Sequence, residues 1–400
     1  MKSEEVEDLF EKKGFSNRVK LINSKDLEFE ISEENSVKIA NTIRDLNYCF
    51  DGKKKIFVKS ALDLSKSNNS GLDLSYCIFE KQVSINNSNH EYEMYLINCE
   101  FRQGVNFSKA IFKNNVRFHN SKFYGKTDFT NTSFKKLVDF YFAEFIEDQQ
   151  FHLTDFEGTT IFSNTTFHKS IQFLHNKVVP NSYISFENAI FHNGLDISRS
   201  NFWCTIQFWG VNFDKTQLNK LQESNLYQND LLTVSGSQSN VSALKRVRET
   251  FRLIKHEFRK QGNNINAQLF HRLEMKVYSE EIKVDTGRLG EKILLLMNGI
   301  SNKHGQSWSR ALGFTLGVTV IAYCIFLLTI RDSIVFAQSW EDVGYTMKYF
   351  LQLLNLTYWD YMPFGEPNEP EGYLILFISR LFIGYGYYQF IQSFRKYGKN

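Results

Sequence analysis

Residues 105–123 read VNFSKAIFKNNVRFHNSKF and contain one eleven-residue unit and the first eight residues of the next. Phenylalanines take matching places in both copies, at positions 107, 112, 118 and 123. The same alternation of six- and five-residue steps runs without a break from Phe101 to Phe173. A period this regular is typical of a solenoid, in which each unit stacks on its neighbours.

The chemistry of the unit favours strands over helices. In a helix, a five-residue step turns by about 140°, so successive phenylalanines would lie on nearly opposite faces. Within a half-unit the apolar residues are two apart, as in Val105 and Phe107, which is the period of a strand. Intervening segments such as Thr130-Asn131-Thr132 favour turns. We therefore expect very short strands that coil around an inward stack of phenylalanine rings.

The half-units resemble the motif of the pentapeptide-repeat family, which has a small residue, a polar residue and a central Leu or Phe. Matching segments are Leu72-Asp73-Leu74, Ala110-Ile111-Phe112, Leu195-Asp196-Ile197 and Val211-Asn212-Phe213. The chain departs from the family by adding a sixth residue in every second unit, and often places Val, Leu or Ile where Ala is usual. The resemblance implies a right-handed, four-sided β-helix of 22 residues per coil, with about six coils from Leu72 to Phe213. The rhythm slips by two residues near Pro180, where we expect a loop.

The composition of the solenoid narrows the choice of partners. Residues 72–213 hold 14 acidic and 12 basic side chains, a balance of −2. Some pentapeptide-repeat proteins imitate DNA with an acidic face, but this charge is too weak for that role, and a nucleic-acid partner is not expected. We expect a rigid spacer, or a docking arm for a cytoplasmic protein. Cys77 and Cys99 lie 22 residues apart and are expected to stack, reduced, in the core.

Five regions follow along the chain. They are an N-terminal cap (1–60), the solenoid (61–215), a polar linker (216–240), a cytoplasmic helical region (241–305) and a membrane domain (306–400). The helical region begins with an apolar stripe over four turns, formed by Leu244, Val247, Phe251, Ile254 and Phe258. A second helix is expected over residues 265–282. Trp203 and Trp209 should point outward from the last coils and dock this helical pair.

The basic residues on the first helix leave two interpretations open. The cluster includes Lys245, Arg246 and Arg248, and it would suit nucleic acid or an anionic membrane face. Interspersed acids such as Glu249 favour a plain solvated face equally well.

Two segments are apolar enough to cross a membrane. Ala311–Ile330 contains twenty residues without a charge, and a second run extends from Gly372 to Phe394. Residues 331–371, between them, carry seven acids and two bases, whereas bases flank the other ends of both runs. The positive-inside rule then predicts a multi-pass protein of the cell inner (cytoplasmic) membrane with both termini in the cytoplasm.

The segment between the two runs resembles the pore loop of two-helix ion channels. A short helix is expected over 345–356, followed by an extended Thr357-Tyr358-Trp359-Asp360. In potassium channels the filter reads Thr-Val-Gly-Tyr-Gly, often followed by Asp and by Pro three residues later. Tyr358, Asp360 and Pro363 match that spacing, while Thr357 and Trp359 replace the two glycines. The resemblance implies a re-entrant pore helix followed by four filter candidates, Thr357, Tyr358, Trp359 and Asp360. The alternative is an interfacial hairpin between two anchoring helices.

Arg380 lies about eight residues, roughly 12 Å, inside the second run. A charge there needs a partner or water. Three interpretations remain open: an ion pair with Asp360 or Glu341, a pore-lining position that favours anions, and snorkelling toward an interface. Gly384 and Gly386 are expected to allow close helix packing.

The sequence therefore predicts an oligomeric membrane pore or ion channel, four-fold if it conducts, with a cytoplasmic solenoid as sensor or docking arm. Two helices per chain cannot enclose a water-filled path alone, so an assembly is implied. The alternative is a non-conducting, membrane-anchored scaffold that holds a cytoplasmic protein. No convincing Ser-His-Asp, metal-ligand or phosphate-loop spacing is present, so no enzymatic activity, cofactor or metal is expected.

Overall fold

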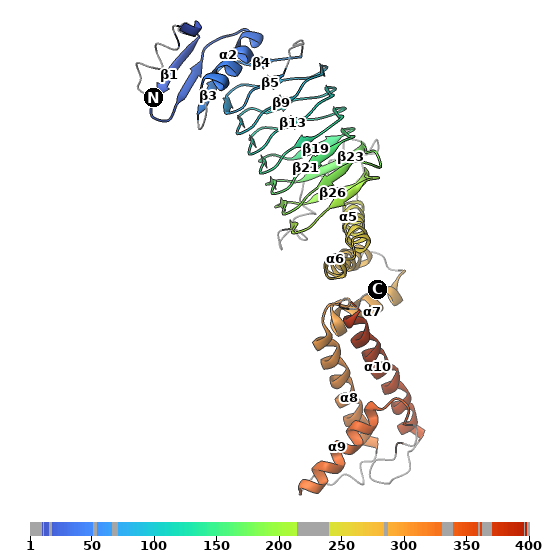
Figure 1. Cartoon of the computed structure of the whole chain (residues 1–400). Coiled ribbons are helices and arrows are strands. Elements are labelled where there is room, and N and C mark those ends of the chain that lie inside the picture. Colours follow the sequence, from blue (N-terminus) through green and yellow to red (C-terminus); the bar gives the residue numbers. More distant parts are fainter. Residues whose placement is uncertain are drawn as a thin grey trace. The chain divides into compact units, whose positions relative to one another are not determined.

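The computed structural model forms two compact units, Met1–Glu257 and Phe258–Asn400 (Figure 1). The described residues are 10, 12–15, 18–50, 54–65, 71–213, 240–283, 287–329, 339–358, 361, 370–395 and 397. The linker expected over 216–240 therefore lies almost entirely outside them. The first unit holds the β-structure and the second holds helices.

The first unit is a solenoid whose described strands line up in four sheets. The first sheet contains β1 (Val19–Asn23), β2 (Glu28–Ile31), β3 (Lys55–Val58), β6 (Cys77–Phe79), β10 (Glu100–Phe101), β14 (Lys122–Phe123), β18 (Glu144–Phe145), β22 (Thr166–Phe167), β25 (Ile190–Phe191) and β28 (Asn212–Phe213). The second contains β4 (Leu62–Asp63), β7 (Val83–Ser84), β11 (Val105–Asn106), β15 (Thr127–Asp128), β19 (Gln149–His152), β23 (Ile171–Lys177) and β26 (Leu195–Asn201). The third contains β5 (Leu72–Asp73), β9 (Met94–Tyr95), β13 (Val116–Arg117), β17 (Val138–Asp139), β21 (Thr159–Ile161), β24 (Tyr183–Ser185) and β27 (Thr205–Gln207). The fourth contains β8 (Asn89–His90), β12 (Ile111–Phe112), β16 (Ser133–Phe134) and β20 (Asp155–Phe156).

Strand register confirms the length of the coil. Phe101 pairs with Phe123 and Val116 with Val138, in parallel, so neighbouring strands are 22 residues apart. Within the described residues, two sheets have seven strands, which makes about seven turns. The expected six coils were too few, because the first turn begins at β4 with Leu62 and lacks the phenylalanines that revealed the repeat. The hand of the coil stays a prediction.

Stacked phenylalanine rings form the core of the solenoid. Phe129 lies between Phe107 and Phe151, with both ring centroids 5.0 Å away and nearly parallel planes. The ring is fully buried, and it also meets Phe118 and Phe140 edge-on. Identical residues stack on identical residues because each coil repeats the position of the last. The expected inward assignment is confirmed.

Left-handed turns mark the repeat as regularly as the rings do. Backbone φ is positive at every eleventh residue from Tyr76 to His175, and Asn occupies five of these ten positions. Asparagine tolerates this conformation better than most residues, since its short side chain bonds locally. The eleven-residue unit therefore reflects one tight turn per unit as well as one buried face.

The coil that contains Pro180 holds the two extra residues that shift the spacing of the phenylalanines. Ile171 pairs with Leu195 and Thr159 with Tyr183, so this one coil spans 24 residues. The next pairing, Tyr183 with Thr205, returns to 22. The two extra residues lengthen β23 and form a turn at Val179–Ser182, and the stack continues beyond them.

A small cap covers the start of the solenoid. Strands β1 and β2 form an antiparallel pair, β2 joins β3, and helix α2 (Ser36–Cys49) buries Ile39, Ile43 and Leu46. The side chain of Asn35 accepts hydrogen bonds from the first turn of α2 and fixes its start. The cap hides the apolar face that an exposed first coil would present.

Cys77 and Cys99 are free, buried thiols, as expected of core residues. Burial raises the pKa of the Cys99 thiol to about 12 and that of Cys77 well above its usual value. Both thiols are therefore protonated at neutral pH, and Cys99 Sγ lies 3.1 Å from the Leu74 carbonyl oxygen.

Helix α5 (Asn240–Lys260) closes the other end of the solenoid through its first five turns. Phe251 packs edge-on against Phe213, and the Ile197 backbone N–H donates to Thr250 Oγ1 at 3.2 Å. Arg246 Nε lies 3.7 Å from the buried carboxylate of Asp196, so this member of the basic cluster faces the solenoid.

The docking role expected of Trp203 and Trp209 does not agree with their exposure. Trp203 and Trp209 point outward as expected, but they remain 77% and 51% exposed and do not hold the helix. Alternation along a strand gives the direction of a side chain and says nothing of what lies opposite it.

The second unit contains α6 (Asn264–Lys283), α7 (Leu289–Asn302), α8 (Trp308–Thr329), α9 (Trp340–Leu354) and α10 (Pro370–Phe394). In the part of the chain that the structure describes, α8 and α10 are the two helices long and apolar enough to cross a membrane. They run side by side, with α9 against them (Figure 1). Helix α7 was not foreseen, although Leu289, Ile293, Leu296 and Ile300 are spaced four, three and four residues apart.

Candidate functional site

Helices α8 and α10 pack closely where a glycine meets a threonine. A Cβ at Gly386 would lie 2.3 Å from Thr315 Oγ1, so only glycine allows this approach. The Thr315 hydroxyl donates to the Ala311 carbonyl at 2.8 Å, and Thr319 bonds Thr315 in the same way. Polar groups inside the helix pair are therefore satisfied along α8 itself. Gly386 has the close-packing role expected of it.

Helix α9 begins with a capping box and packs on α8. Ser339 Oγ accepts from the Asp342 N–H, and the Asp342 carboxylate accepts from the Ser339 N–H. Farther along, the Tyr323 hydroxyl lies 3.4 Å from the Thr346 carbonyl oxygen, and its ring meets Phe350 edge-on. The start of α9 is exposed, while its later turns are held against α8.

The C-terminal end of α9 lies beside the middle of α10. Arg380 Nη1 donates to the Leu356 carbonyl at 3.2 Å, and the Tyr387 hydroxyl donates to the Leu354 carbonyl at 3.1 Å. Arg380 and Tyr387 lie on either side of the midpoint of the apolar span Gly372–Phe394. Leu356 Cδ1 would also be 3.7 Å from a Cβ at Gly384. The carbonyls at the last residue of α9 and just past it are thus bonded to side chains from the middle of α10.

Arg380 serves as a cap for α9. Its side chain is buried, with the residue only 6% exposed, and its guanidinium donates to a carbonyl just past the end of the helix. The C-terminus of a helix carries a partial negative charge, which a cation stabilises. Asp360, one expected partner, lies outside the described residues. Glu341, the other, is in the first turn of α9, at the opposite end of that helix.

Of the four filter candidates, the structure describes Thr357 and Tyr358. They leave the helix at Asn355, whose Oδ1 accepts from the Thr357 N–H at 3.1 Å and from the Thr357 hydroxyl at 2.8 Å. Asn355, Thr357 and Tyr358 are exposed and not helical. Trp359 and Asp360 lie outside the described residues. Tyr361 is fully buried and packs edge-on against Phe326 of α8.

The polar residues near the end of α10 are held by α7. Asn298 Oδ1 accepts from the Tyr385 hydroxyl and from Gln389 Nε2, both at 2.7 Å. Asn302 Nδ2 donates to the Gln389 carbonyl at 3.2 Å. The sequence marked Gln389 as polar within an apolar run but did not identify these partners. Asn298 and Asn302 are four residues apart, which places both on one face of a helix.

Comparison with known proteins bears on the solenoid alone. Residues 95–133 match a family model described as "Pentapeptide repeats (9 copies)". This segment is a pentapeptide-repeat segment, as the motif resemblance implied. No curated protein and no solved structure matches the chain significantly.

Proposed function

We propose that this protein is an oligomeric membrane pore, in which α8 and α10 cross the bilayer and α9 enters it from the extracytoplasmic side and ends near its centre. The observation that supports this most is the pair of contacts from Arg380 and Tyr387 to the carbonyls at the end of α9. An anchoring hairpin needs neither a buried arginine nor a helix that ends at mid-membrane depth. The distribution of charges around the two spans favours both termini in the cytoplasm.

Exposed backbone at that depth favours a water-filled path. Residues 355–358 are largely not helical, and Asn355, Thr357 and Tyr358 are exposed in the single chain. Non-helical backbone is tolerated within a membrane only where it is buried in protein or faces water. Neighbouring copies of the chain, four in the arrangement we propose, would bring these segments together around an axis. The solenoid would then serve as a cytoplasmic sensor or docking arm.

A non-conducting scaffold is the second candidate, and the filter sequence favours it. Thr357 and Trp359 stand where a potassium filter has glycines, and side chains there obstruct the backbone geometry that such a filter uses. In the scaffold, α8 and α10 only anchor the solenoid in the membrane, and the outer faces of the solenoid bind a cytoplasmic protein.

Conductance of the purified, full-length protein in planar bilayers distinguishes the pore from the non-conducting scaffold. A pore predicts discrete single-channel currents, and a change in reversal potential when Thr357 is replaced by aspartate. The control variant is Lys81→Gln, in the solenoid, which is expected to leave the currents unchanged. Leu351→Asp would not serve as a control because it would place a charge on an apolar face of α9. Silent bilayers, with the protein shown to be inserted, would favour the scaffold.

A further inference from the structure

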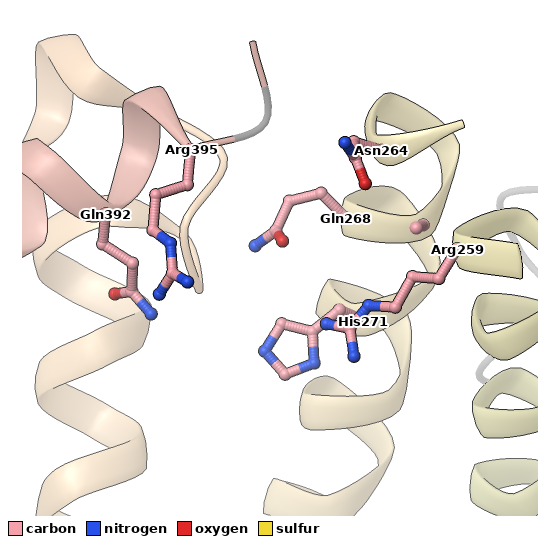
Figure 2. Close-up of a pocket in the computed structure, with 7 residues that line it drawn as sticks. Arg259, Asn264, Gln268, His271, Gln392 and Arg395 are labelled. Atoms are coloured by element: carbon pink, nitrogen blue, oxygen red, sulfur yellow. The ribbon is translucent and has the colours of Figure 1, made fainter. Parts of the chain in front are cut away.

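An open pocket of about 400 Å³ lies between α6 and the end of α10 (Figure 2). Arg259, Gln268 and His271 line one side of it, and Gln392 and Arg395 line the other. In Figure 2 the labelled side chains extend from the two helical walls into the space between them. The volume suits a small, polar ligand group.

The pocket is cationic, and the described residues that line it include no acid. Among the described residues, neither the Arg259 nor the Arg395 side chain forms an ion pair or a hydrogen bond. The nearest carboxylate interaction is that of Glu274, which lies 3.6 Å from His271 Nδ1. Two guanidinium groups that face one cavity without a counter-ion repel each other, and a bound anion would remove that repulsion.

Further hydrogen-bond donors in the pocket also favour an anionic ligand. Asn264 begins α6, so the positive end of that helix dipole lies at the pocket, with the Asn266 N–H capped by Asn263 Oδ1 at 3.1 Å. Gln392 accepts from Asn302 through Oε1 at 3.4 Å, which leaves its Nε2 group to donate. The lining therefore offers charged and neutral donors from α5, from α6 and from the end of α10.

The pocket also lies beside the membrane boundary that the apolar helices define. Arg395 directly follows the span that ends at Phe394. Helix α7 links α6 to α8, and its Leu289, Ile293 and Leu296 side chains are 67%, 50% and 62% exposed. An exposed apolar face next to a membrane span is typical of a helix that lies in the interface. A cationic pocket at that level is within reach of lipid headgroups and of cytoplasmic solutes.

We infer that this pocket binds a phosphate group, with Arg259 and Arg395 as the two charged ligands. Guanidinium forks match phosphate oxygens in geometry as well as charge. The group could be the headgroup of an anionic phospholipid or a free phosphate, since the same chemistry recognises both. The site goes beyond the proposed pore and is independent of whether the protein conducts.

The test uses the full-length protein in detergent with two probes. Native mass spectrometry measures retention of phosphatidylglycerol against phosphatidylcholine, and calorimetry measures binding of inorganic phosphate. Arg259→Gln and Arg395→Gln should each weaken binding about tenfold, the size expected for one charge-assisted hydrogen bond. Arg259→Lys should lie between wild type and Arg259→Gln. Lys276→Gln, an exposed cation on α6 outside the pocket, is the matched control and should bind as wild type does.

The outcomes distinguish the source of the phosphate. If the arginine variants lose phosphatidylglycerol but not inorganic phosphate, the site holds a lipid headgroup. The reverse pattern identifies a soluble phosphate compound, and loss of both supports the shared chemistry. If both arginine variants, singly and combined, bind both probes as the Lys276→Gln variant does, the inference is wrong. Both arginines are exposed, so their replacement should leave the fold intact, which circular dichroism checks.

Discussion

Replacement of Phe129 by alanine is expected to lower the free energy of unfolding of the solenoid by about 3–5 kcal/mol. The ring is fully buried and stacks on Phe107 and Phe151, 5.0 Å away on either side. Deletion of the ring leaves a cavity that the neighbouring coils cannot close, because their backbones are fixed by hydrogen bonds to the next coil. Both flanking rings also lose a stacking partner.

Phe142 offers a matched control in the same stretch of repeats. It is 50% exposed and lies at one of the left-handed turns, outside the stack. Phe142→Ala should therefore change the stability by less than about 1 kcal/mol. Urea unfolding of the full-length protein in detergent, followed by hydrogen exchange of residues 105–173, measures both variants. Equal stability of the two would show that the stack is not the core of the solenoid.

Replacement of Arg380 by methionine should destabilise the second unit by about 2–3 kcal/mol, the value for a lost hydrogen bond from a charged donor. Methionine keeps most of the side-chain volume but removes the buried guanidinium that donates to the Leu356 carbonyl. The negative end of the α9 dipole would also lose its cation. Arg380→Lys should recover part of the loss, since one donor and the charge remain.

The control for this variant is Arg310→Met, at the start of α8. Arg310 is exposed and flanks the apolar span, so its loss should have little effect on stability. Thermal unfolding of the detergent-solubilised protein, followed by tryptophan fluorescence, compares the variants. If Arg380→Met and Arg310→Met unfold at the same temperature, Arg380 does not fix the end of α9.

The solenoid could be predicted from sequence because its core repeats the same residue at the same place. Each Phe that follows the six- and five-residue spacing from Phe101 to Phe173 marks one inward position, so the period alone gives the coil length of 22 residues. The count of coils missed the first turn, although the predicted solenoid over 61–215 includes it, because Leu62 and Leu64 fill the inward positions there. Burial requires an apolar side chain of suitable size, and it does not require phenylalanine.

The site formed by α8, α9 and α10 was predictable in its elements and not in its contacts. Length and lack of charge identify α8 and α10, and the turns of α9 follow from its composition. The described partner of Arg380 is a backbone carbonyl, which every residue carries, so no side-chain pattern in the sequence could reveal it. The ion pair with Asp360 stays a prediction, since Asp360 lies outside the described residues. The polar partners on α7 were missed because that helix was itself not foreseen.

Accessibility of Thr357 to water tests the central claim, that residues after α9 lie in a water-filled path within the membrane. The measurement is the labelling of Thr357→Cys by a membrane-impermeant thiol reagent, added from the extracytoplasmic side to protein that carries Cys49→Ser and Cys324→Ser. Leu351→Cys, on the apolar face of α9, should stay unlabelled, and Trp340→Cys, at its exposed start, should react fully. The account predicts that Thr357→Cys reacts, because thiolates form in water and not in lipid. A cysteine at 357 as unreactive as the one at 351 would contradict it.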